Sequence, residues 1–161
     1  MGDSSEVESL NSSKYLYLRE LAEPKDNSLR ITVDEAIANR VERLPASAPG
    51  SNDALKDYHP IEHTRDCKGF ELTWKHYIAY LVTEECVGSC GDYQDEMYTG
   101  KVFRVYSKSH FLEHLARDTG GHTQPIHHYK LICLNHLVDV ASYSPPAIRA
   151  LASGSEQDRT D

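Results

Sequence analysis

Alternating apolar and polar residues recur in several short segments of this chain, and they constrain its fold more than any other feature. Phe70, Leu72 and Trp74 alternate with polar neighbours, and so do Leu29 and Ile31. A period of two is typical of a β-strand that buries one of its faces. Such strands need a covering layer, so we expect a sheet packed against helices.

The other alternating segments bring the expected number of strands to about six. These strands are predicted over residues 14–20, 29–33, 61–67, 70–82, 102–106 and 129–141. A capping box begins at Thr32, so either a short helix starts there or the preceding strand continues through it. Asn135 lies either inside one strand or in a hairpin turn. The few helical segments do not alternate with strands. We therefore predict an α+β fold, a single domain with a curved, mainly antiparallel β-sheet of about six strands and two or three short helices.

The two ends of the chain differ in composition from its middle. Residues 1–13 and 153–161 are small, polar and charged, so both are predicted to be disordered tails. A single α+β domain is expected over residues 14–152. Its core is expected to contain Phe70, Leu72, Trp74, Ile78, Val105, Phe111, Leu115, Leu131 and Leu137.

The charge balance restricts the kinds of partner. The chain has 17 lysine and arginine residues against 25 aspartate and glutamate residues, a net charge of −8, and no basic run. Phosphate backbones would be repelled, which argues against nucleic acid, whereas a basic protein would be attracted. The first residues lack the apolar core of a secretory signal and no apolar run is long enough to cross a membrane. We therefore expect a cytoplasmic protein with no membrane partner.

The segment His110-Phe111-Leu112-Glu113-His114 combines metal-ligand chemistry with helical spacing. On a helix His110 and His114 share one face, so both rings could reach one Zn²⁺ while Glu113 activated a bound water as the catalytic base. The alternative is an amphipathic helix whose Phe111 packs inward while the polar side chains face water. Ser107 or Ser109 is expected to cap this helix.

A zinc site of this kind needs a third protein ligand. The only downstream glutamate lies in the polar C-terminal tail, so His127 or His128 is the candidate, from a segment that also holds His122. A second histidine group, His59, His63 and His76, flanks predicted strands, and Cys86 with Cys90 forms the one closely spaced cysteine pair. Cys67 and Cys133 are expected to be small buried apolar residues.

Residues 84–100 form a predicted acidic loop that also contains tyrosine. Tyrosine supplies contact area in protein interfaces while tolerating water. The loop lacks the regular alternation of a calcium-binding loop. Its candidate partner-binding residues are Glu84, Glu85, Asp92, Tyr93, Asp95, Glu96 and Tyr98.

The leading hypothesis is a small acidic binding protein, of the inhibitor or immunity type, for a basic protein partner. It follows from the net charge, the tyrosine-bearing acidic loop and the lack of a nucleophile elbow, phosphate loop or dinucleotide fingerprint in the sequence. A non-enzymatic role without a cofactor is favoured. The alternative is a zinc-dependent hydrolase that uses the His-x-x-Glu-His motif.

Overall fold

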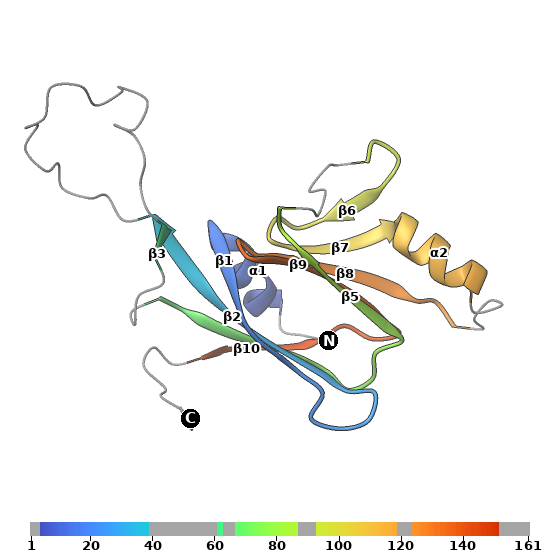
Figure 1. Cartoon of the computed structure of the whole chain (residues 1–161), viewed down its shortest axis with the longest axis horizontal. Coiled ribbons are helices and arrows are strands. Elements are labelled where there is room, and N and C mark those ends of the chain that lie inside the picture. Colours follow the sequence, from blue (N-terminus) through green and yellow to red (C-terminus); the bar gives the residue numbers. More distant parts are fainter. Residues whose placement is uncertain (1–3, 39–60, 63–66, 87–92, 119–123, 152–161) are drawn as a thin grey trace, which may run out of the picture.

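The computed structural model of the chain describes residues 4–38, 61–62, 67–86, 93–118 and 124–151 (Figure 1). Its elements follow the chain as α1 (Ser4–Ser12), β1 (Tyr15–Ala22), β2 (Leu29–Ala38), β3 (Ile61–Glu62), β4 (Gly69–Trp74), β5 (Ala79–Glu84), β6 (Met97–Thr99), β7 (Phe103–Lys108), α2 (His110–Asp118), β8 (His127–Ile132), β9 (His136–Ser142) and β10 (Ala147–Leu151). The α+β class is confirmed. The strands form two antiparallel sheets, however, instead of the single sheet expected.

The first sheet has the strand order β1-β2-β4-β10, and the two-residue β3 is added on β2. Its register places apolar residues opposite one another, Ile31 against Leu72 and Val33 against Phe70. Such cross-strand pairs stabilise a sheet whose inner face is buried away from water. The strands predicted over 14–20 and 29–33 form the β1–β2 hairpin, whose turn contains Asn27 with a φ of 59°, a left-handed conformation that asparagine tolerates.

The second sheet has the strand order β5-β9-β8-β7-β6. Strands β8 and β9 pair in register from His127 opposite Ser142 to Ile132 opposite Leu137. Asn135 therefore lies in a hairpin turn, which settles the alternative that the sequence left open. In Figure 1 helix α2 lies beside β7 and β8 at one end of this sheet.

The core lies between the inner faces of the two sheets. Trp74 of β4 contacts Tyr129 of β8 with ring centroids 5.9 Å apart, and Tyr129 also stacks on Phe103 of β7. Six of the nine core residues expected from the sequence are buried, namely Phe70, Leu72, Trp74, Leu115, Leu131 and Leu137. The other three, Ile78, Val105 and Phe111, are half-buried.

The number of strands was underestimated for two reasons: β6 and β10 lie outside the predicted strands, and two apolar runs each contain a change of direction. Residues 70–82 look like one long strand, but β4 belongs to the first sheet and β5 to the second, so the chain crosses between sheets at residues 75–78. Residues 129–141 likewise divide into β8 and β9. Alternation within a strand carries no information about the sheet to which that strand belongs.

The N-terminal segment also differs from the prediction. Residues 4–12 form helix α1, where a disordered tail was expected, and Leu10 is fully buried in the core. Helix α1 lies against β7 of one sheet and β10 of the other. Only Val7 and Leu10 of this helix pack on the core, which is too few for its apolar face to be evident in the sequence.

Two other local expectations are resolved by the structure. The capping box at Thr32 does not start a helix, because β2 continues to Ala38. The segment after Pro145 and Pro146, for which no strand was expected, forms strand β10 and pairs with β4. Within the described residues no helix is long and apolar enough to cross a membrane.

Candidate functional site

Helix α2 begins where two predicted sites meet, the histidine motif and the acidic loop. The hydroxyl of Ser109 accepts a hydrogen bond from the N–H of Leu112 at 3.2 Å, which confirms the expected cap. Oε1 of Glu96 accepts the N–H of His110 at 2.9 Å. A carboxylate at this position is favoured because the first amide groups of a helix carry partial positive charge.

The side chain of His110 lies between two carboxylates. Its Nε2 is 3.1 Å from Oδ1 of Asp95, and its Nδ1 is 3.7 Å from Oε2 of Glu113. The hydrogen bond with His110 lowers the pKa of Asp95, and the charges of His110 and Lys108 lower it further. The ring of Tyr93 meets the His110 ring edge-on, with centroids 5.1 Å apart.

These contacts hold residues 93–97 in one conformation. The N–H of Glu96 donates to the carbonyl of Tyr93 at 3.0 Å and closes a turn, while Met97 starts strand β6. Tyr93 is 54% exposed and Met97 is 62% exposed, the two highest values among the large apolar side chains that the structure describes. We call Tyr93, Asp95, Glu96 and Met97 the 93–97 surface.

The two histidines of the motif have different partners. Nε2 of His114 lies 3.4 Å from Oδ2 of Asp118, one turn further along α2, whereas His110 turns towards Asp95. Both histidines and Glu113 are exposed on the outer face of the helix. In the described part of the chain, no group of three or more histidine, cysteine, aspartate or glutamate side chains is placed to hold a metal ion.

The two candidate third ligands lie apart from this helix face. His127 is exposed on β8, whereas His128 is 2% exposed and lies beneath α2, where its ring is 5.0 Å from that of Phe111. Nε2 of His128 is 2.8 Å from Oδ1 of Asp139, and Nζ of Lys130 is 3.3 Å from the same oxygen. His128 thus belongs to a buried polar network within the second sheet.

This network was not found from the sequence. Lys130 and Asp139 face each other across the β8–β9 hairpin. Their pairing follows from the hairpin register, so placing the turn at Asn135 would have revealed it. The network satisfies Nε2 of His128, whereas Nδ1 of the same ring is buried without a hydrogen-bond partner among the described residues.

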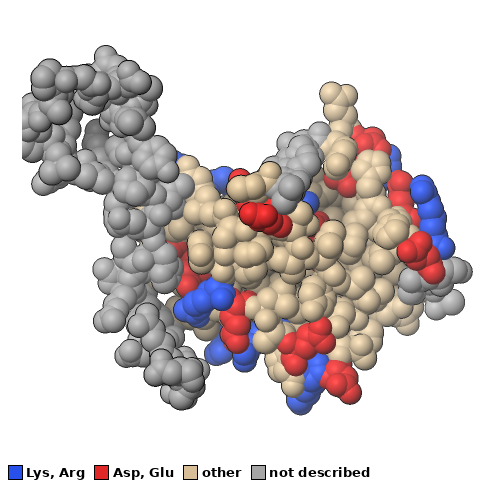
Figure 2. All heavy atoms as spheres, viewed as in Figure 1, with Lys and Arg blue, Asp and Glu red and all other residues tan. Residues whose placement is uncertain are grey.

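Of the predicted acidic loop the structure describes residues 84–86 and 93–100. Glu84 and Glu85 lie at and just after the end of β5, whereas Asp95 and Glu96 precede β6, and these two strands are the opposite edges of the second sheet. Figure 2 shows acidic side chains dispersed among basic ones on the face in view. Asp92 lies outside the described residues.

Tyr98 is engaged within the fold. The guanidinium carbon of Arg104 lies 4.1 Å from the centre of the Tyr98 ring, and the ring also contacts Tyr106. Cation–π contacts of this kind hold both side chains in place. Of the candidate partner-binding residues that the structure describes, Tyr93, Asp95 and Glu96 lie together beside His110, whereas Glu84 and Glu85 lie at the opposite edge of the sheet.

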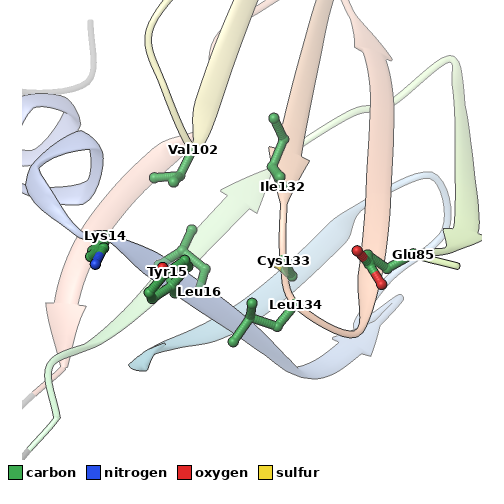
Figure 3. A pocket seen from close by; sticks show the side chains of 8 residues that line it. All are labelled: Lys14, Tyr15, Leu16, Glu85, Val102, Ile132, Cys133 and Leu134. Atoms are coloured by element: carbon green, nitrogen blue, oxygen red, sulfur yellow. The ribbon is translucent and has the colours of Figure 1, made fainter. Parts of the chain in front are cut away.

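A small pocket lies at the other end of the second sheet, near the β8–β9 turn (Figure 3). Its volume is about 110 Å³, and it is lined by Lys14, Tyr15, Leu16, Glu85, Val102, Ile132, Cys133 and Leu134. Burial raises the pKa of Cys133 to about 12, so its thiol stays protonated and is a poor nucleophile at neutral pH. The expectation that Cys67 and Cys133 are buried is confirmed.

The remaining candidate groups lie only in part within the described residues. His59, His63, His122 and Cys90 are outside them, while His76 is exposed after β4 and Cys86 is exposed after β5. Comparison with known proteins finds no match to any family, to any curated protein or to any solved structure.

Proposed function

We propose that this chain is a binding protein that recognises a basic protein partner through the 93–97 surface, in the manner of an inhibitor or immunity protein. The exposure of Tyr93 and Met97 beside Asp95 and Glu96 is the observation that carries the proposal. Tyrosine and methionine are enriched in protein interfaces. A net charge of −8 attracts a basic partner and speeds its encounter.

The fixed conformation of the surface supports the same proposal. Glu96 and Asp95 are tied to the start of α2 through His110. A segment that is already ordered loses less conformational entropy when it binds, so more of the contact energy appears as affinity. The zinc-dependent hydrolase stays the alternative. No contact at His110, Glu113 or His114 favours it, and metal analysis of the purified chain tests it.

Capture from a native lysate tests the proposal. The wild-type chain should retain a basic protein, and a bait carrying Tyr93→Ser and Met97→Ser should lose it because the two apolar contacts are removed. The matched control carries Tyr17→Ser and Ile37→Ser, which remove side chains that are 44% and 47% exposed on the first sheet. Retention of the same protein by the Tyr93 and Met97 bait, or an acidic protein as the only ligand, would contradict the proposal.

A further inference from the structure

Strand β5 is an edge of the second sheet whose outer side has no partner within the described residues. It pairs with β9 alone, and neighbouring side chains on its two faces, Leu81 and Val82, are 50% and 39% exposed. The β1–β2 turn reaches the chain just before the strand, where the carbonyl of Asn27 accepts the N–H of Tyr77 at 2.8 Å. The hydroxyl of Tyr80 in β5 also donates to Oε1 of Glu23 in this turn at 2.8 Å, so the turn covers the start of the strand. No described residue pairs with the outer side of the strand beyond Tyr80.

The other strand edges are protected. On β1 the N–H of Leu134 from the β8–β9 turn donates to the carbonyl of Leu16, and the side chain of Asn135 bonds both backbone groups of Leu18. Strand β6 has three residues and a register shift, and β10 carries Arg149 and contacts α1. Short length, bulges, charges and covering elements are the usual means by which edges avoid pairing.

Strand β5 is less protected than these edges, since its only charged residue, Glu84, lies at its end. Its six residues, Ala79–Glu84, contain no proline, lysine, arginine or register shift. Alternate backbone N–H and C=O groups of such an edge point away from the sheet and can pair with another strand. The remaining question is which strand fits beside it.

The charges at the two ends of β5 indicate which strand can pair with it. Exposed Lys75 and His76 lie before the strand, and exposed Glu84 and Glu85 lie at its end. Within the described residues neither Lys75 nor Glu84 has an ion-pair partner. An antiparallel copy of the same strand, paired over Ala79–Glu84, would place Leu81 and Val82 next to the twofold axis. Glu84 of each copy would then face Ala79 of the other, so Glu84 and Glu85 would lie towards the end at which Lys75 and His76 precede the strand.

We propose that two copies of this chain associate through β5, so that the second sheets of both join into one antiparallel sheet. A twofold contact of this kind uses the same residues on both copies and closes on itself. Only one strand from each copy takes part, so the dimer is weaker than complexes with interfaces of standard size. Because β5 and the 93–97 surface lie on opposite edges of the sheet, this dimer is independent of the proposed function.

Sedimentation equilibrium across a concentration series, at physiological ionic strength, tests the dimer. The wild-type mass should rise from that of one chain towards that of two. Lys75→Glu, which makes both ends of the strand acidic, should remain a monomer, as should the pair Glu84→Lys and Glu85→Lys, which makes both ends basic. Fluorescence of Trp74, the only tryptophan, reports from the core whether each variant is folded.

A mixture of these two variants tests whether opposite charges at the strand ends restore the dimer. The acidic ends of one would face the basic ends of the other, so the mixture should form a heterodimer although each variant alone does not. Both variants keep the negative sign of the wild-type net charge of −8, since one becomes more negative by two charges and the other less negative by four. A wild-type chain that stays monomeric throughout the series, or a mixture that stays monomeric, would overturn the proposal.

Discussion

Asn11 and the turn at Gly100 connect helix α1 to the second sheet through hydrogen bonds. Oδ1 of Asn11 accepts the backbone N–H groups of Lys101, Val102 and Phe103 at 2.7, 3.1 and 3.1 Å. The turn that presents these groups requires a φ of 92° at Gly100. A Cβ atom there would lie 2.1 Å from the carbonyl oxygen of Phe103, so only glycine fits.

Gly100→Ala should therefore lower the free energy of unfolding by about 2–3 kcal/mol, because the added methyl group forces this turn open. Urea unfolding followed by Trp74 fluorescence measures the loss. Lys101→Ala is the control, since its side chain is exposed, and it should change stability by less than about 0.5 kcal/mol. Equal stability of Gly100→Ala and wild type would show that the turn is not needed.

At the scale of elements, helix α2 is best understood through the contacts at its first turn. The sequence predicted the helix, a cap at Ser107 or Ser109 and, as one of two interpretations, the exposure of the polar residues of the histidine motif. It could not predict that Asp95 and Glu96 lie at the helix start, because that contact depends on where β6 joins the sheet. Helical spacing placed both histidines on one face, but their partners are set by neighbours at residues 95 and 118.

His110→Phe tests this first turn through the titration of Asp95. The replacement keeps a ring against Tyr93 but removes the hydrogen bond that lowers the pKa of Asp95, so that pKa should rise towards its ordinary value. Carboxyl-carbon NMR measures the midpoint directly. Lys108→Met should cause a smaller rise, because Nζ of Lys108 is 3.9 Å from Oδ2 of Asp95 and contributes the lesser effect.

The direction of the pH dependence follows from the lowered pKa. A depressed carboxyl pKa means that the Asp95 contact contributes stability above the ordinary carboxyl pKa, and that this contribution is lost as the pH falls through the value in the folded state. The His110→Phe chain should lack this part of the acid dependence. An Asp95 midpoint that does not move in His110→Phe would show that the hydrogen bond is absent in solution.

At the scale of the whole molecule, two sheets enclose one core and α1 lies against a strand of each. Alternation at Leu29, Ile31, Phe70 and Leu72 was sufficient to predict strands, their buried faces and the α+β class. The sequence did not separate the two sheets, since the crossing at residues 75–78 carries no strong turn signal. It also missed α1, whose contribution to the core is small.

The same arrangement divides the predicted acidic loop between two edges of the second sheet. The 93–97 surface, for which partner binding is proposed, lies at one edge, while Glu84 and Glu85 lie at the end of β5, the opposite edge. The separation allows one edge to bind a different protein while the other pairs with a second copy. Both roles are testable with exposed substitutions that leave the core unchanged.

The association rate of the captured partner tests the central claim most directly. Asp95→Lys with Glu96→Lys should slow association about tenfold or more at low salt while changing dissociation less, because charge steers the encounter. Glu8→Lys with Asp26→Lys makes the same change in net charge at exposed positions on α1 and the β1–β2 turn, and should slow association much less. Equal rates for the two double variants would contradict recognition through the 93–97 surface.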